Sequence, residues 1–201
     1  MKTIPILFST PMVQAILDGR KTMTRRILKV KGCKPFIPDR TWNLDTINKW
    51  NKDYHPYGQP GDILWVRETT CHVMLEHAHD LLEGAKDKTQ FVYKCNVHSD
   101  WMEYAKEKYG YKWTPSIFMP KAACRIFLKV VSVRVEWLQF ISEADAQAEG
   151  TPFIKGVGED IGRPWAMSFA ALWQKINGNW DDAPRVWVIE FETVERPEGF
   201  V

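Results

Sequence analysis

The sequence predicts a mixed α+β protein, mostly β, in which short helices pack on a small barrel. Three observations predict it: several β-rich segments between turns, few and short helical segments, and a change of hydrophobic phase within the long apolar run 126–137. Ile126, Leu128 and Val130 share one parity, whereas the apolar residues from Val131 onward share the other. A bulge or barrel corner near Val130 would explain this change of face.

The helices are predicted from signals at their ends. They are expected near 11–18, 142–149 and 164–177, with a further helical segment around 99–108. Ser142 is a hydroxyl N-cap, and Gly150 suits the left-handed residue that follows a helix. Pro164 opens the last helix at the position where proline is tolerated. These signals predict where each helix begins and ends.

The strands are predicted from β-branched and aromatic runs. They are expected at 4–8, directly behind the helix stop at Gly19, at 63–69, at 91–95, along 126–137 and at the end of the chain. In the last strand, Trp187, Ile189 and Phe191 are predicted to point inward, and the tail 195–201 is expected to be solvated. Residues 31–60 are expected to form an ordered loop, and about 72–118 an insertion.

Composition indicates an ordinary globular chain with one domain over 1–201. Its 201 residues carry 27 Lys and Arg against 25 Asp and Glu, so any nucleic-acid contact has to come from a local patch. Four scattered cysteines without a CxxC pair favour reduced thiols and a cytoplasmic location. The N-terminus is expected to be a strand rather than a leader, and no apolar run is long enough for a membrane span.

The segment 19–26 concentrates cations and hydroxyls directly behind a helix stop. Arg20, Lys21, Arg25 and Arg26 could hold phosphate. The like charge of the three arginines would also favour a neutral Lys21 amine, and hence a better base than an ordinary lysine. A plain solvated basic turn is the alternative interpretation.

Three motifs in order resemble the ASCH domain, a member of the PUA-like β-barrel superfamily. They are LDGRKTMTRR at 17–26, PGDILWVRET at 60–69 and ISEADAQAEG at 141–150. The ending FAALWQKINGNWDDAPRVWVIEF is similar to that of the family, and WTPSIFMPKAACRI at 113–126 resembles longer members found in phages and prophages. The resemblance covers residues 4–193 apart from portions of 31–59 and 72–112.

The resemblance implies a cleft that binds RNA, a nucleotide or a modified nucleoside. Some small members of the family are metal-independent amidohydrolases that deacetylate N4-acetylcytidine with a Lys, a Thr and a Glu. Those positions correspond here to Lys21, Thr24 and Glu149. A base, a hydroxyl nucleophile and a carboxylate suit amide hydrolysis, but Lys21 has to lie in the turn before the strand to meet Thr24. This chain is about twice as long as those members, and its insertion could roof the cleft or change its substrate.

Further candidate ligand contacts lie on the predicted strand 63–69 and in the loop near 120. Trp65 and Arg67 could stack on a base or pair with a phosphate, and Glu68 is predicted to point inward. Arg26 is a candidate partner for Glu68, as a structural ion pair or as part of a ligand site. Ser116 and Lys121 resemble a loop that borders the cleft in the longer relatives, whereas packing and ordinary exposure are the alternatives.

Neither a metal nor another cofactor is expected. Cys71, His72, His77 and His79 match no standard zinc spacing, and GVGED at 156–160 lacks the spacing of a phosphate loop. Three functions remain open: an amidohydrolase, a non-catalytic RNA-binding module, and an accessory protein that binds another protein through the aromatic insertion. The sequence alone does not choose between them.

Overall fold

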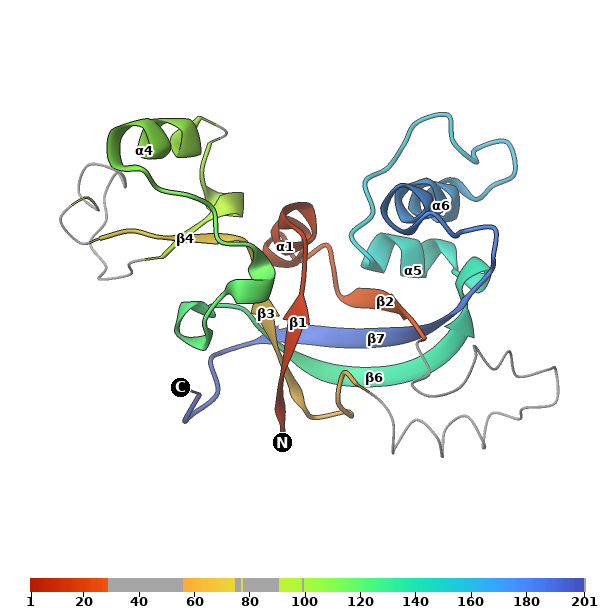
Figure 1. Ribbon diagram of the computed structural model, residues 1–201. Coiled ribbons are helices and arrows are strands. Elements are labelled where there is room, and N and C mark those ends of the chain that lie inside the picture. Colours follow the sequence, from red (N-terminus) through yellow and green to blue (C-terminus); the bar gives the residue numbers. More distant parts are fainter. Residues whose placement is uncertain (29–55, 75–76, 78–90, 99, 201) are drawn as a thin grey trace. The chain divides into compact units, whose positions relative to one another are not determined.

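The computed structural model describes residues 1–28, 56–74, 77, 91–98 and 100–200 (Figure 1). Most of the loop predicted for 31–60 lies outside these residues. The strands are β1 (Thr3–Leu7), β2 (Met23–Ile27), β3 (Ile63–Arg67), β4 (Thr70–His72), β5 (Phe91–Tyr93), β6 (Phe127–Trp137) and β7 (Arg185–Val194). The helices are α1 (Thr10–Leu17), α4 (Trp101–Tyr109), α5 (Glu143–Ala148) and α6 (Pro164–Asn177), with 3-10 turns η1 (Lys94–Asn96), η2 (Ser116–Phe118), η3 (Lys121–Ala123) and η4 (Leu138–Phe140).

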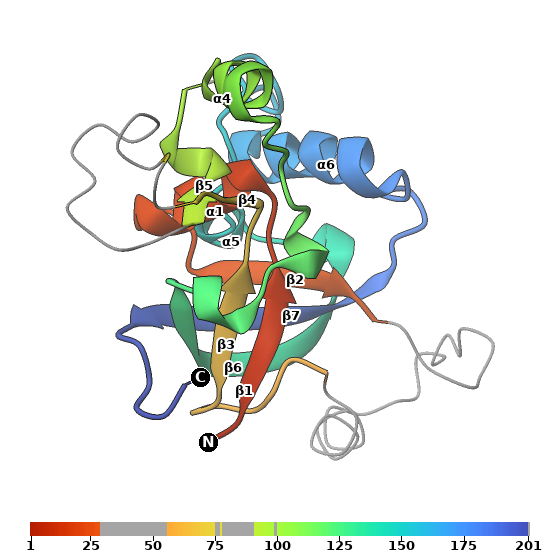
Figure 2. The same ribbon diagram turned by 60° about the vertical axis from the view of Figure 1, so that its left-hand side comes forward.

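The described strands form two hydrogen-bonded sheets. One has five strands in the order β1-β3-β6-β7-β2, and the other pairs β4 with β5. The long strands β6 and β7 are neighbours (Figure 1 and Figure 2). β2 runs antiparallel to β7, with Thr24 opposite Ile189. The mixed α+β class is therefore confirmed, while the closed barrel and the bulge near Val130 stay predictions.

The chain divides into two compact units, each made of three stretches of sequence. The first contains Met1–Ile4, Ala15–Leu64 and Leu128–Thr193, and the second contains Pro5–Gln14, Trp65–Phe127 and Val194–Val201. The divisions fall inside α1 and inside the strands β1, β3, β6 and β7. In the described part of the chain, no helix combines the length and hydrophobicity needed to cross a bilayer.

The core of the first unit is built between α6 and β7. Phe169 and Trp173 of α6 pack in a cluster with Val186 and Val188 of β7. Trp187, Ile189 and Phe191 are buried, as predicted for the inward residues of β7, and Val186 and Val188 are buried as well. β7 is an interior strand between β6 and β2, and α6 covers the face that carries Val186 and Val188.

The described part of the predicted insertion builds a small core of its own in the second unit. Cys71, Val73, Val92 and Ala105 are buried, and α4 and β5 confirm the helix and the strand predicted there. The aromatic residues packed against this cluster are Trp101, Tyr109, Tyr111 and Trp113. These rings therefore contribute to packing within the insertion, and binding of another protein through it stays a prediction.

The C-terminal tail departs from its predicted solvation at one residue. Phe200 is 8% exposed. Its ring meets Phe127 at a centroid distance of 4.8 Å and Trp65 at 5.9 Å, both edge to face. A large aromatic ring gains more from burial than a short polar tail loses by being ordered around it.

Candidate functional site

Lys21 lies in the turn between α1 and β2, as the sequence predicts for a residue that has to act beside Thr24. Gly19 adopts a left-handed conformation with φ of 71°, and the amide of Lys21 then donates to the carbonyl of Ala15 at 2.9 Å. Lys21 forms an isolated antiparallel bridge with Glu149, before β2 begins at Met23. The helix stop therefore places this lysine against the end of α5.

The Lys21 and Glu149 side chains form a buried ion pair. The Lys21 Nζ atom donates to Glu149 Oε2, to the Glu149 carbonyl and to the Met23 carbonyl, each at 2.8 Å. The two residues are 2% and 8% exposed. Three acceptors around one nitrogen match the three hydrogens of an ammonium group. The structure thus joins two of the three residues that the family resemblance singled out.

The pKa of Lys21 lies below its ordinary value. Burial is the largest cause because it removes the ammonium from water, and the charges of Arg26 and Arg25 act in the same direction. The Glu149 carboxylate opposes them by stabilising the ammonium. The sequence predicts this direction from the neighbouring arginines, but desolvation contributes more.

Thr24 is buried in β2, three residues after Lys21. Its partner across the ladder is Ile189 of β7. The local order of turn, lysine and strand therefore keeps the hydroxyl in the same short segment as the amine. A reaction at Thr24 would take place away from bulk water.

Arg25 takes a structural place, which corrects its predicted role in holding phosphate. Its guanidinium is buried and contacts Asp145 at 2.6 Å, Glu136 at 3.1 Å and Glu149 at 3.3 Å. A phosphate would have to displace these carboxylates from a guanidinium that is itself inaccessible to solvent. Arg134 extends the same network to Glu136, Asp145 and Glu190.

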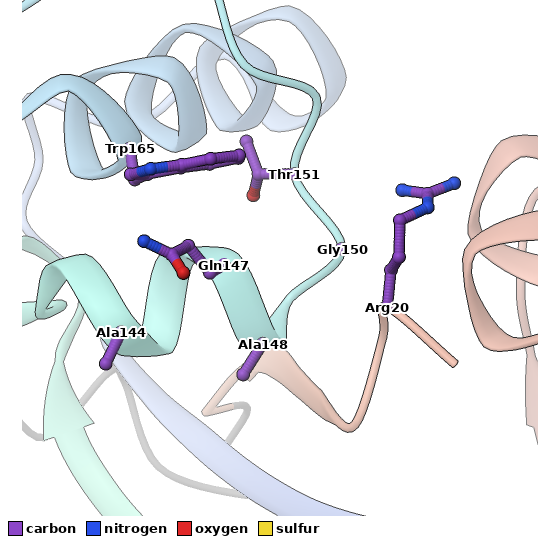
Figure 3. A pocket seen from close by; sticks show the side chains of 7 residues that line it. All are labelled: Arg20, Ala144, Gln147, Ala148, Gly150, Thr151 and Trp165. Carbon is purple, nitrogen blue, oxygen red and sulfur yellow. The ribbon is translucent and has the colours of Figure 1, made fainter. Parts of the chain in front are cut away.

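A hollow of about 450 Å³ lies beside the ion pair of Lys21 and Glu149 (Figure 3). Its lining residues are Arg20, Ala144, Gln147, Ala148, Gly150, Thr151 and Trp165. Arg20 precedes Lys21 in the chain, and Ala148 and Gly150 flank Glu149. The wall of the hollow is therefore made by the neighbours of the two candidate catalytic residues.

Gly150 allows the end of α5 to approach the Lys21 turn. Its φ is 70°, which only glycine adopts without strain. A Cβ atom there would lie 2.8 Å from the Cβ of Ala15 and 2.9 Å from the Cβ of Lys21. The glycine predicted as a helix terminator is thus also required for close packing.

A carboxylate from α5 fixes the position of Trp165 in the hollow. The backbone N–H groups of Trp165 and Ala166 donate to Glu143 at 2.9 and 2.8 Å. The N–H groups of the first turn of a helix have no acceptor within that helix, so Glu143 acts as the cap of α6. Ser142 caps α5 in turn, accepting from the amide of Asp145 at 3.0 Å, as its sequence position predicts.

Glu68 belongs to a second buried ion pair, in the other unit. It pairs with Arg125 through two hydrogen bonds of 2.9 Å, so the partner that the structure provides is Arg125 and not the predicted Arg26. The thiol of Cys95 lies 3.3 Å from Glu68. Burial, with the adjacent carboxylate, raises the pKa of this thiol to about 11, which keeps it protonated and unreactive.

Trp65 and Arg67 are engaged within the protein rather than presented to a ligand. The Trp65 ring is buried, so it offers no face to a base. Arg67 lies over that ring at 5.4 Å and donates to the carbonyls of Ile117 and Met119. This corrects the prediction that both side chains contact a base or phosphate.

The remaining predicted contacts occupy more open positions. Ser116 is half-buried in η2. Lys121 is exposed, with its Nζ atom 5.4 Å from the Phe200 ring. Arg20 is exposed and pairs with Asp18 at 2.8 Å. Arg26 is half-buried, and burial lowers the pKa of its guanidinium. Of these residues, Arg20 lines the hollow.

The described histidines and cysteines do not gather at one point. Within residues that the structure describes, no three His, Cys, Asp or Glu side chains are placed to hold a metal ion. His72 packs on Phe91, and His77 stacks on Tyr109 at a centroid distance of 4.0 Å. His79 lies outside the described residues.

The residues that give the hollow its polar and aromatic character are not evident from the sequence. Trp165, Gln147 and Thr151 are not among the site residues predicted from the sequence. Thr151 directly follows Glu149 and Gly150, where the chain turns sharply at the end of a helix. This position next to a candidate catalytic residue was a signal that could have marked Thr151 as a site residue. Arg134 and Asp145 were missed because strand and cap patterns do not indicate ion pairs.

Neither a protein-family model nor a curated protein matches this chain. Among solved structures, the crystal structure of protein EF3133 from Enterococcus faecalis V583, of the family DUF984, is similar at a TM-score of 0.42. The match has 11% sequence identity and covers 98% of this chain and 84% of that chain. A likeness this distant carries no argument about the site.

Proposed function

We propose that this chain is a cytoplasmic ASCH-type protein, built on a PUA-like barrel, that removes the acyl group from N4-acetylcytidine or a related N-acylated pyrimidine. The reacting residues are Lys21, Thr24 and Glu149. One observation supports this most: a buried lysine with a lowered pKa contacts a carboxylate at 2.8 Å, next to a hollow large enough for a small ligand.

The chemistry begins with loss of a proton from the Lys21 ammonium, whose contact with Glu149 provides an acceptor. The neutral amine then takes the hydroxyl proton of Thr24 while the Thr24 oxygen bonds to the acyl carbon. The C–N bond breaks as the amine of the pyrimidine receives a proton from Glu149 or Lys21. Water hydrolyses the ester left on Thr24, which releases the acid and restores the hydroxyl. Every step uses side-chain acids, bases and nucleophiles.

The test is turnover of N4-acetylcytidine by the purified protein, followed by chromatography for cytidine and repeated with a chelator. Lys21→Met keeps the length of the side chain but removes the base, so kcat should fall at least about a hundredfold. Thr24→Val should abolish the ester intermediate. Lys129→Met is the matched control, because Lys129 forms an exposed surface pair with Glu192. Full turnover in Lys21→Met would contradict the proposal.

A second candidate is a non-catalytic module that binds RNA or a nucleotide. The burial of Lys21, Thr24 and Glu149 favours it, because a substrate has to reach all three for catalysis. Binding to short RNA should then weaken as salt rises, through the more open Arg20 and Arg26 rather than Arg25. Salt-sensitive binding without turnover would select this function over the hydrolase.

A further inference from the structure

We infer that Trp165, Thr151 and Gln147 form the recognition site for a planar heteroaromatic ring with a hydrogen-bonding edge. The ring lies on the indole of Trp165, and its polar edge bonds to the Thr151 hydroxyl and the Gln147 amide. The identity of the ring as a pyrimidine rests on the proposed function. The site itself rests on the hollow and its lining.

Thr151 carries the strongest indication of a ligand. The residue is 4% exposed, and its Oγ1 atom makes no hydrogen bond with any residue that the structure describes. The same residue lines the hollow. Buried hydroxyls normally have a partner, because burial without one costs free energy. A ligand that enters the hollow with a polar edge supplies that partner.

Trp165 and Gln147 bring the other two contacts from separate helices. Figure 3 shows the indole from α6 and the amide from α5 on the same hollow as Thr151. The cap from Glu143 fixes the backbone at Trp165, and a tilted contact with Phe153, at a centroid distance of 5.1 Å, supports the indole ring. A ring that is already fixed loses little freedom when another ring stacks on it.

The rest of the lining limits the size and the charge of the ligand. Ala144, Ala148 and Gly150 have small side chains, which leave room for a flat ring. Arg20 lies across the hollow from Trp165 in Figure 3 and is the ionic residue of the lining. Among the residues that the structure describes, no carboxylate lines the hollow, so a neutral ring fits it, and an anionic group on the ligand would be placed toward Arg20.

The experiment measures the binding of cytidine and cytidine 5′-monophosphate by titration calorimetry. Thr151→Val keeps the shape but removes the hydroxyl, so affinity should fall about tenfold. The thermal unfolding midpoint should stay the same or rise, because a buried hydroxyl without a partner has been removed. Trp165→Leu and Gln147→Leu should also weaken binding, whereas the exposed Thr193→Val is the matched control and should change neither quantity.

The outcomes separate this inference from the proposed hydrolase. If binding depends on Thr151 and Trp165 but no turnover is detected, the ring site is supported and the proposed hydrolase activity is contradicted. The ring site is overturned if Thr151→Val and Trp165→Leu both turn over the substrate with an unchanged KM. It is also overturned if neither ligand binds at millimolar concentration. Arg20→Gln distinguishes the two ligands, since it should weaken only the monophosphate if the anionic group faces Arg20. Equal loss for both ligands would place Arg20 at the ring instead.

Discussion

Lys21 combines two opposing influences on its charge. The carboxylate of Glu149 stabilises the ammonium, whereas burial and two arginines destabilise it, and the second group prevails. A proton that is bound less tightly in the folded protein than in the unfolded chain makes stability depend on pH. The same residue therefore connects the ion pair, the fold and the proposed reaction.

The pH dependence of turnover should report this balance. A base acts only when neutral, so kcat/KM should rise with pH and level off below 10.5, the ordinary value of a lysine pKa. Arg26→Gln removes a cation that lowers the pKa of Lys21, and should move the rising limb to higher pH. Lys129→Gln, on the exposed surface, should leave it in place.

The pH dependence of the unfolding free energy provides an independent check of the direction of the pKa shift of Lys21. The folded protein disfavours the Lys21 ammonium, so the unfolded chain binds that proton more tightly. Stability relative to Lys21→Met should therefore increase as pH rises from the lowered pKa of Lys21 to 10.5. Urea titrations across this window measure it, and a decrease would show that Glu149 dominates instead.

At the scale of single residues, the sequence predicted which residues belong to the candidate site better than it predicted which side chains they contact. The family resemblance selected Lys21 and Glu149, which the structure joins over 128 positions of the chain. It could not separate buried Arg25 from exposed Arg20, because both are cations in one short segment. Burial depends on the carboxylates of distant elements, such as Glu136, and no local pattern contains that information.

At the scale of elements, α5 and α6 form the frame of the hollow. Their relative position is fixed where Glu143, in the first turn of α5, accepts from two amides at the start of α6. That arrangement satisfies backbone donors that the helix cannot satisfy itself. It also orients Trp165, so the cap contributes to stability and to the shape of the hollow together.

Glu143→Ala should reveal both contributions. Loss of a helix cap costs about 1 kcal/mol of unfolding free energy, and the negative charge near the helix dipole adds to it. Urea denaturation measures this loss, and KM for the acylated nucleoside should rise because Trp165 is no longer held. Glu192→Ala is a suitable control, since this exposed residue makes a surface pair with Lys129. Equal effects of the two substitutions would contradict the capping role.

The helices were more predictable than the strands for a physical reason. A hydroxyl, a proline or a glycine at a helix end acts through nearby backbone groups, so Ser142, Pro164 and Gly178 carry the boundaries in the local sequence. The burial of β7 depends instead on its neighbours, β6 and β2, and on the cover given by α6. Alternation predicts one buried face, which β7 has, whereas the burial of Val186 and Val188 on the other face depends on α6 and not on the local pattern.

At the scale of the whole molecule, the division into units does not follow the chain. Each unit combines three separate stretches, and four strands as well as α1 contain residues of both. The sequence predicts one domain because no linker-like composition separates its parts. A boundary drawn through the middle of a strand cannot be anticipated from composition, since the strand has the same apolar pattern on each side of it.

The boundary interrupts β1, β3, β6, β7 and α1, which leads to a prediction about unfolding. One unit can unfold alone only if its part of each shared strand separates while the other part stays paired. Backbone N–H and C=O groups at the break would then lose their hydrogen-bond partners. We therefore expect one cooperative transition, with tryptophan fluorescence and far-ultraviolet circular dichroism giving the same midpoint in urea.

Two core substitutions test this cooperativity. Val188→Ala removes buried methyl groups from the first unit, and Val92→Ala does so in the second. Each should lower the free energy of unfolding by about 2 kcal/mol and shift the common midpoint seen by both probes. Two separated transitions, with Val92→Ala moving one of them and Val188→Ala the other, would instead show that the units unfold independently and that the strands they share do not couple them.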